Sequence, residues 1–337
     1  MRKTFVIAEA GVNHNGEIRK AFELVDIAVA AKADAIKFQT FKPGECTGEF
    51  AVMVDYVRDA CKNYKSRYDV AKKLALPYSD FVKIKKYSEK KKILFLTTPD
   101  GYESLEYVVG TLKVPMIKIS STEVTHLKFI EKVATKGMPI ILSTGLSTLK
   151  EVEIAMNVIR KYHNNVMLLH CVSEYPTPDR NANIRAICAL RDHFKCRVGY
   201  SDHTKGFEAS LAAVAIGASI IEKHFTIDRN LPGPDHNFSL SPCQLVDFIK
   251  SIRKVELMLG TGIKKPTRGE LRNINGIRRS VVASKGLRKG TLLKSEDIDF
   301  KRPGYGVHPY DYEKIIGFRL KKDMIKDEPI EWKHLER

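Results

Sequence analysis

The chain of 337 residues lacks the signals of several common protein classes. Its six cysteines are scattered and form no CxxC pair, at Cys46, Cys61, Cys171, Cys188, Cys196 and Cys243. This spacing is not typical of a disulfide framework, so we expect reduced thiols in the cytoplasm. No apolar run reaches about 18 residues, which predicts no membrane-spanning helix. Glu9 and Asn13 interrupt the apolar start, and we expect no signal peptide.

Acidic residues are scarce relative to basic ones. The chain has 40 Asp and Glu against 57 Lys and Arg, a net charge of +17. Such an excess can indicate nucleic-acid binding, but here the basic residues mostly alternate with acidic ones and no aromatic cluster lies beside them. We therefore expect no nucleic-acid partner. A basic cleft would instead concentrate an anionic small-molecule substrate.

A glycine-rich phosphate fingerprint is also missing after the first apolar run, which disfavours a dinucleotide-binding fold. What the sequence does contain is a unit repeated eight times, a short apolar run followed by a helical stretch. The runs are FVIAEAG (5–11), DAIKFQT (34–40), ILFLTTP (93–99), PMIKISS (115–121), PIILSTG (139–145), NVMLLHC (165–171), RVGYSDH (197–203) and SIIEKHF (219–225). Apolar runs of this length are typical of buried parallel strands. Eight such units predict an α/β fold, a (β/α)₈ TIM barrel.

The remaining segments predict the domain organisation. We expect a catalytic barrel over residues 1–262, with a long excursion over 42–76 that is too long for a simple connection. Residues 263–279 are polar, basic and rich in turns, which favours a linker. Residues 280–337 carry short apolar runs between glycine turns. They predict a small second domain that needs support from the barrel or from another subunit.

Polar residues interrupt the apolar runs near their carboxyl ends, where barrel enzymes place their active sites. Spacing of two along a strand puts side chains on one face. Such pairs are Lys37 with Gln39, Lys118 with Ser120, Ser201 with His203, and Glu222 with His224; Glu9, Ser143, Asp235 and His236 add to them. So much polarity at one end of a barrel predicts an active site.

His203 and His224 follow neighbouring strands and could meet at one metal ion. Neutral imidazoles bind divalent transition metals well, and two of them leave positions for water and a substrate oxygen. Each histidine alone could equally be a core residue or a general base. The pair beside Glu9 and Asp235 favours a divalent metal.

An anion pocket is predicted from Lys37, Lys118, Ser121, Ser143 and Ser201, which supply cations and hydroxyl donors. A strand-end lysine can also form a Schiff base, so an imine-forming aldolase that uses Lys118 is an alternative. A third hypothesis is a non-catalytic protein that binds nucleic acid through its basic tail. Two lysines with several serines favour phosphate recognition.

Ordered motifs along the chain resemble the sialic acid synthase family. They are EAGVNHNG (9–16), KFQTF (37–41), SEYPTP (173–178), YSDHT (200–204), EKHFT (222–226) and GPDHNFS (233–239) in the barrel, and RPGYGV (302–307) in the tail. The tail resembles the family's antifreeze-like (β-clip) domain. The resemblance implies condensation of phosphoenolpyruvate with an unphosphorylated N-acetylated mannosamine-type sugar, which gives a nine-carbon 2-keto acid and phosphate by C–O cleavage.

The resemblance also implies a role for each matching residue. His203 and His224 would bind Mn²⁺, or Mg²⁺ or Co²⁺, and Glu9 would lie near the ion and its water. Phosphoenolpyruvate would bind Lys37, Lys118, Ser121, Ser143 and Ser201. The sugar would contact Gln39, Glu123, Tyr175, Asp235 and Arg302. Arg302 would come from the antifreeze-like domain of a partner subunit, so a domain-swapped homodimer is expected.

Departures from the family's usual motifs concern the sugar. SEYPTP and GPDHNFS replace the NLYPTP and GPDIVCS typical of bacterial N-acetylneuraminate synthases. The variants at Glu174 and His236 are more similar to the branch making legionaminic acid, whose precursor carries a second acetamido group and lacks a hydroxyl. We expect both residues to face the sugar. KISSTE (118–123) also departs from the family's usual strand, although Lys118, Ser121 and Glu123 are retained.

Overall fold

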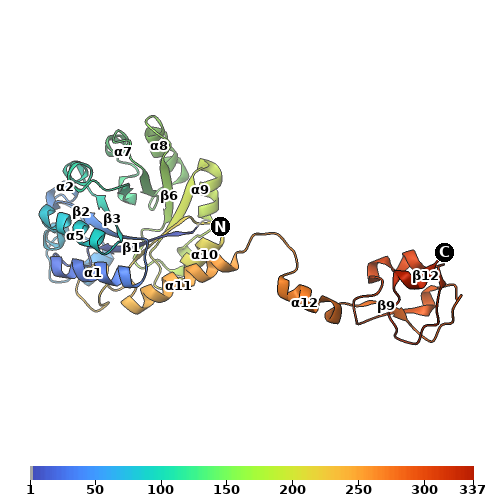
Figure 1. Cartoon of the computed structure of the whole chain (residues 1–337). Helices are drawn as coiled ribbons and strands as arrows, with labels where there is room; N and C mark the ends of the chain where they lie inside the picture. The colour runs from blue at the N-terminus through green and yellow to red at the C-terminus, as the bar shows by residue number, and fades with distance from the viewer. Residues whose placement is uncertain (1–2) are drawn as a thin grey trace. The chain divides into compact units, whose positions relative to one another are not determined.

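The computed structural model describes residues 3–337 and confirms the eight predicted strands (Figure 1). They are β1 (Phe5–Gly11), β2 (Ala35–Thr40), β3 (Leu94–Pro99), β4 (Ile117–Ile119), β5 (Ile140–Ser143), β6 (Val166–Cys171), β7 (Arg197–Asp202) and β8 (Ile220–His224). They form a parallel sheet in the order β3-β2-β1-β8-β7-β6-β5-β4, and the end strands β3 and β4 contact each other. The predicted barrel is therefore confirmed as a nearly closed one.

Helices cover the outside of this sheet (Figure 1). They are α1 (Ile18–Ala30), α5 (Tyr78–Lys90), α6 (Tyr102–Tyr107) with a π-helical turn (Val108–Leu112), α7 (Leu127–Ala134), α8 (Leu149–Arg160), α9 (Ala186–Phe194), α10 (Glu208–Ala215) and α11 (Pro242–Met258). Sequence signals set some of their starts. Thr148 and Glu151 form a capping box that begins α8, and Ser241 and Gln244 form another before α11. Each box satisfies amide donors that a helix start leaves free.

The core of the barrel consists of two apolar clusters. The larger one lies between strands and helices and includes Leu24, Phe38 and Phe129. The smaller one, inside the barrel, includes Ile7, Leu96, Ile141, Leu169 and Ile220. Inward-facing side chains of a barrel fill its interior in layers, so the apolar inner layer leaves the polar residues to the carboxyl ends of the strands.

Strand register brings the polar residues of neighbouring strands to one level. Glu9 of β1 pairs with Lys37 of β2 on one side and with His224 of β8 on the other. Ser201 of β7 pairs with Glu222 of β8. Because parallel strands end at the same edge, residues 28 and 215 positions apart become neighbours of Glu9.

The excursion after β2 folds back onto the barrel. It contains α2 (Pro43–Cys46), α3 (Asp55–Ala60) and α4 (Arg67–Leu74). Apolar side chains of this segment form one cluster with Val12 and Phe41, which belong to the barrel; they include Val57, Cys61, Val70 and Leu74. The excursion is therefore anchored by its own small core.

Contacts divide the chain into two compact units, Met1–Thr261 and Gly262–Arg337. The second unit holds α12 (Arg268–Ile277), β9 (Ser280–Ala283), β10 (Ile298–Lys301), β11 (Arg319–Leu320) and β12 (Leu335–Glu336). Helix α12 lies within the segment expected as a linker, and Thr267 and Glu270 cap its start. Within residues 3–337, none of the helices combines the length and the apolar character needed to span a bilayer.

Candidate active site

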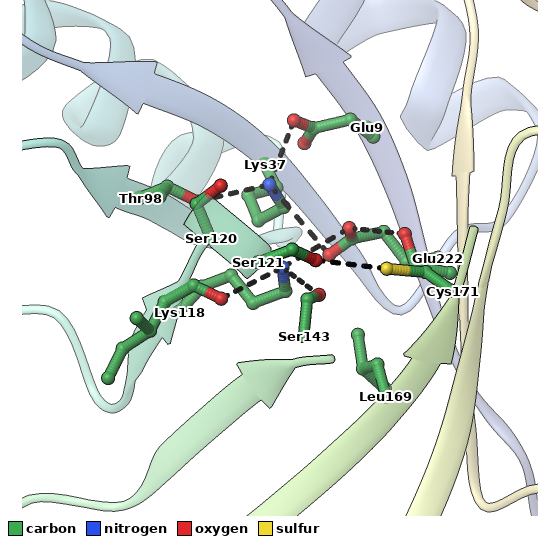
Figure 2. A network of polar contacts seen from close by, with 12 residues as sticks. Glu9, Lys37, Thr98, Lys118, Ser120, Ser121, Ser143, Leu169, Cys171 and Glu222 are labelled. Carbon is green, nitrogen blue, oxygen red and sulfur yellow. Dashed lines mark hydrogen bonds and ion pairs between the residues drawn. The ribbon is translucent and has the colours of Figure 1, made fainter. Parts of the chain in front are cut away.

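A cavity of about 710 Å³ at the carboxyl ends of the strands contains both predicted anion-binding lysines. We call it the lysine chamber; its lining includes Glu9, Lys37, Lys118, Ser121, Ser143, Ser201, His203, Glu222 and His224. Figure 2 shows that both lysines are directed toward Glu222. The structure thus brings together all five residues predicted to bind phosphoenolpyruvate and the three predicted catalytic residues.

Buried ion pairs hold the lysines in place. Lys37 Nζ donates to Glu9 Oε1 at 2.8 Å and lies 3.8 Å from Glu222 Oε2. Lys118 Nζ donates to Ser143 Oγ at 2.7 Å and lies 3.4 Å from Glu222 Oε1. Every one of these side chains is less than a tenth exposed. Charges held this way are already ordered before a ligand arrives.

Burial sets the protonation of this cluster. It raises the pKa of Glu9 to about 8, although Lys37 opposes the shift. Burial also lowers the pKa of Lys118, and Glu222 opposes it. For Glu222 the two lysines outweigh burial, so its pKa is lowered. Glu222 is therefore the firmly ionised carboxylate, and Glu9 is the group that can change its protonation near neutral pH.

The two histidines lie next to each other with their ring centroids 5.7 Å apart. His203 Nδ1 donates to the Val172 carbonyl oxygen at 2.7 Å, which leaves the lone pair on Nε2. His224 Nδ1 is buried, has no hydrogen-bond partner among the described residues and lies 3.7 Å from Asp235 Oδ2. Burial lowers the pKa of His203 to about 4 and that of His224 well below its usual value. Both imidazoles are therefore neutral and have a nitrogen lone pair that could bind a metal ion.

Gly11 has no side chain, which allows Glu9, His224 and Asp235 to lie close to its backbone. Its φ of +51° lies in the left-handed region, and a Cβ there would lie 3.3 to 3.4 Å from Asp235 Oδ2, Glu9 Oε1 and His224 Cε1. A side chain at position 11 would strain the backbone and crowd all three groups. The glycine of the EAGVNHNG motif therefore makes room at the centre of the site.

A second cavity of about 320 Å³ adjoins the first and has a different lining. We call it the carboxylate chamber because Asp100, Glu123 and Asp235 line it, with Arg67 as the cation. The two chambers share Gln39, Tyr56, Arg67, Ser120, Thr122, Tyr175 and His224. Burial raises the pKa of Asp100 and of Asp235 to about 7. Four of the five predicted sugar-binding residues thus line one chamber next to His224.

The fifth, Arg302, belongs to the second unit. It is exposed, and its Nε donates to the Ile277 carbonyl oxygen at 2.9 Å. Its expected contact with the sugar stays a prediction.

His236 does not face the sugar, and this prediction is wrong. The side chain is fully buried and lines neither chamber. Its Nε2 donates to the Asn15 side-chain oxygen at 3.1 Å, and its Nδ1 lies 2.6 Å from the Thr226 hydroxyl. His236 therefore stabilises the loop that contains Asp235. Glu174 does line the lysine chamber, and its Oε2 accepts from Asn181 at 3.0 Å.

Sequence reasoning gave no role to several residues of the site. The sequence indicates that Glu222 lies on the same strand face as His224, two positions away. Its contact with both lysines depends on the closed barrel. Thr98 and Asp100 follow β3, and Thr98 Oγ1 accepts from Lys37 at 3.2 Å. Arg67 and Tyr56 come from the excursion, where no periodicity could have indicated them.

Comparisons with known proteins show which family the chain is similar to. The model of the NeuB family matches residues 24–264, and that of the SAF domain matches residues 278–336. The chain is 41% identical to the N,N'-diacetyllegionaminic acid synthase of Campylobacter jejuni over 98% of this chain and 99% of that protein. It is 37% identical to the N,N'-diacetyllegionaminic acid synthase of Legionella pneumophila over 98% and 94%, respectively. A solved N-acetylneuraminic acid synthetase from Leptospira borgpetersenii, in complex with citrate, matches with a TM-score of 0.71 and 35% identity over 81% of this chain and 90% of that one.

Proposed function

This chain belongs to the NeuB family, and we propose that it is a transferase that condenses phosphoenolpyruvate with an unphosphorylated N-acetylated mannosamine-type sugar. The product is a nine-carbon 2-keto acid, of the N,N'-diacetyllegionaminate type as in the two relatives named above, or of the N-acetylneuraminate type. Phosphate leaves by C–O cleavage. One observation carries the proposal: a chamber of buried lysines adjoins a chamber of carboxylates, and His224 lines both.

The lysine chamber suits phosphoenolpyruvate. That substrate carries a carboxylate and a phosphate, which two ordered ammonium groups and the hydroxyls of Ser121, Ser143 and Ser201 can bind. Gly145 N donates to Ser121 Oγ at 2.9 Å, so this hydroxyl is already oriented. Binding then needs little rearrangement of side chains.

The carboxylate chamber suits a neutral sugar. Asp100, Glu123 and Asp235 can accept hydrogen bonds from hydroxyl and amide groups, which an N-acetylated sugar offers in number. In their ionised form, which Asp100 and Asp235 reach as the pH rises through about 7, these carboxylates repel a phosphate ester, because like charges in a partly buried site interact strongly. This lining supports an unphosphorylated acceptor.

The two histidines fit a divalent ion, for which we propose Mn²⁺. Each is neutral, and the bond from His203 Nδ1 to a carbonyl oxygen is the outer contact that orients metal-binding imidazoles. Among residues 3–337 no group of three or more His, Cys, Asp or Glu is assembled for a metal, so water and substrate oxygens would complete the set. Bound there, the ion supplies Lewis acidity to polarise the sugar aldehyde.

The chain's own residues handle charge and protons. The C2–C3 π electrons of phosphoenolpyruvate form the bond to the aldehyde carbon, and the aldehyde oxygen takes the electron pair of its own π bond and then a proton. Water adds to the electron-deficient C2. Glu9 stabilises the positive charge at C2 and accepts a proton from that water, since its Oε2 has no partner among the described residues and its pKa lies near neutrality. Lys37 and Lys118 hold the phosphate, which leaves with the electron pair of the C–O bond while the added oxygen becomes the ketone.

A substrate panel tests this function. Phosphate release is measured from phosphoenolpyruvate and Mn²⁺ with three acceptors: N-acetylmannosamine, its 6-phosphate, and the 2,4-diacetamido trideoxy sugar. We expect the diacetamido sugar to react fastest and the 6-phosphate slowest. Failure of all three, or full activity in EDTA, would overturn the proposal.

One observation favours the alternative of an imine-forming aldolase. Burial lowers the pKa of Lys118, as a Schiff-base lysine requires. Its contacts with Ser143 and Glu222 instead suit a charged lysine that binds phosphate. Borohydride trapping of a keto acid on Lys118 would support the aldolase.

We also propose the family's domain-swapped homodimer, in which Arg302 completes the sugar site of the partner. The tail's resemblance and its match to the SAF domain support this assembly. Two inactive variants, Arg302→Ala and His203→Ala, should regain part of the activity when they are refolded together. No regain would argue that each chain completes its own site.

A further inference from the structure

Another cavity lies at the opposite end of the barrel from the active site. It has a volume of about 780 Å³ and lies where strands β6 and β7 begin, whereas the lysine chamber lies where these strands end. We call it the amino-end cavity; its lining includes Arg160, Arg191, Lys195 and Arg197. A cavity of this size can hold a small organic ligand.

The lining of the amino-end cavity is basic. It has four cationic side chains, and none of the described residues that line it is Asp or Glu. Arg191 Nε lies 3.7 Å from Asp192 Oδ1, and His193 Nε2 lies 4.0 Å from Glu153 Oε1. Both acidic side chains are more than half exposed and lie outside the lining, and ion pairs of this kind contribute little. The cavity therefore has an excess of positive charge.

Two of the guanidinium groups are held in place by backbone carbonyls. Arg160 Nη2 donates to the Phe194 carbonyl oxygen at 2.6 Å, and Arg191 Nη1 donates to the Ile216 carbonyl oxygen at 2.9 Å. These carbonyls lie at the ends of α9 and α10, where a cation also offsets the helix dipole. A guanidinium has five N–H donors, so a single carbonyl bond leaves each arginine able to bind an anion as well.

Gly217 makes room for one of these groups. Its φ of +96° lies in the left-handed region, and a Cβ there would lie 2.9 Å from Arg191 Nη1. A side chain at this position would strain the backbone and displace the guanidinium. Buried Val166, Phe194 and Val198 also line the cavity. Because apolar groups lower the local dielectric, they strengthen the attraction between the cations and an anion.

We propose that the amino-end cavity binds a small anion that carries phosphate groups, at a site separate from the lysine chamber. The planar fork of a guanidinium matches two phosphate oxygens at once, and two ordered forks with a neighbouring ammonium suit a multiply charged anion. A concave cavity favours a small molecule, whereas nucleic acid is typically bound by a basic stripe along a face or a helix. The inference goes beyond the proposed function and does not depend on it.

Calorimetric titration with inorganic pyrophosphate tests the site. The wild type should bind pyrophosphate at the amino-end cavity. Arg160→Met and Arg191→Met should each weaken this binding by about 10- to 100-fold, because a hydrogen bond to a charged group is lost. Lys118→Met removes a cation from the lysine chamber instead, so it should retain the binding. Citrate, which carries a similar charge on carboxylates, should bind more weakly than pyrophosphate.

Lys161→Met is the matched control. Lys161 follows Arg160 directly, but it is exposed and does not line the cavity, so its substitution should leave the affinity unchanged. Thermal unfolding establishes that each variant is folded. If an arginine variant does not fold, Lys195→Glu takes its place; the side chain is exposed, and reversing its charge should weaken binding at least 10-fold.

Each outcome supports or overturns the site. Binding that is lost in the arginine variants and retained in Lys118→Met and Lys161→Met supports it. No binding in Lys118→Met, or unchanged affinity in the folded arginine variants and in Lys195→Glu, overturns it. Equal affinity for citrate overturns the assignment to phosphate. A DNA duplex that binds more tightly than pyrophosphate and is lost in the same variants would assign the cavity to nucleic acid and overturn the small anion.

Discussion

Strands β7 and β8 carry two buried polar clusters, one on each face. Ser201, His203, Glu222 and His224 point into the lysine chamber. Asp202 and Lys223 alternate with them, and their backbones are register partners. The Asp202 and Lys223 side chains form an ion pair at 3.1 Å with almost no exposure.

The two clusters differ in how completely they are hydrogen-bonded. Asp202 Oδ1 accepts from the backbone and the hydroxyl of Thr204, at 2.9 and 2.7 Å, and Oδ2 accepts from Ser210 at 2.6 Å. Lys223 donates to the Thr204 carbonyl oxygen at 2.5 Å. On the inner face, Glu222 Oε2 and His224 Nδ1 have no hydrogen-bond partner among the described residues. Since buried polar groups are normally satisfied, the inner cluster is arranged for a ligand and the outer one for stability.

Removing the inner histidines is the strongest test of the difference between the two clusters, because the inner cluster should be needed for activity. His203→Ala and His224→Ala should each lower kcat by about 10³-fold or more, because the aldehyde then lacks its electrophilic assistance. Steady-state phosphate release measures the loss. His193→Ala is the control, since that exposed histidine lies outside both chambers. Near-normal rates would refute the proposed role.

The outer pair should affect folding rather than chemistry. Lys223→Met leaves Asp202 as an uncompensated buried charge, and we expect the free energy of unfolding to fall by about 3 kcal/mol. Urea unfolding measures it. The double variant Asp202→Asn with Lys223→Met should recover part of the loss. If the KM for phosphoenolpyruvate rises in the folded variants, the outer pair also affects substrate binding, which contradicts the expectation.

Replacing Lys118 of the inner cluster should affect catalysis rather than folding. Lys118→Met should lower kcat/KM for phosphoenolpyruvate by about 100-fold, because a charge-assisted contact with the anion is lost. The KM for the sugar should change little. Varying each substrate separately measures both, with the exposed Lys161→Met as control. A loss confined to the sugar would place phosphoenolpyruvate elsewhere.

The smallest expected effect concerns pH. Burial and Glu123 raise the pKa of Asp100 to about 7 in the folded protein, above its ordinary value of 3.8. The folded state therefore holds a proton that the unfolded state releases, so stability is lost as pH rises from about 4 to about 7. Asp100→Asn removes this loss and should stabilise the substrate-free protein by about 1–2 kcal/mol at pH 8 and less at pH 5. Thermal unfolding at both pH values measures it; an equal shift at both would contradict the expectation.

Much of the barrel could be predicted because its signals are local. Each strand is a short apolar run, and spacing of two placed Ser201 with His203 and Glu222 with His224 on one face. The alternating residues Asp202 and Lys223 follow from the same rule, although their pairing depends on strand register. Helix α12 lay in a segment too polar and rich in turns to stand out from a linker.

The sequence by itself determined the eight strand–helix units and the polar residues at the strand ends, because periodicity and motif order depend on neighbouring positions. Only the tertiary structure decided which polar residues share a cavity. His236 belongs to the same motif as Asp235 yet is buried behind the carboxylate chamber, and Val57 and Arg67 come from an excursion without any sequence signal yet line that chamber. Closure of a barrel joins residues distant along the chain, and whether a side chain faces a cavity or the core depends on what packs behind it.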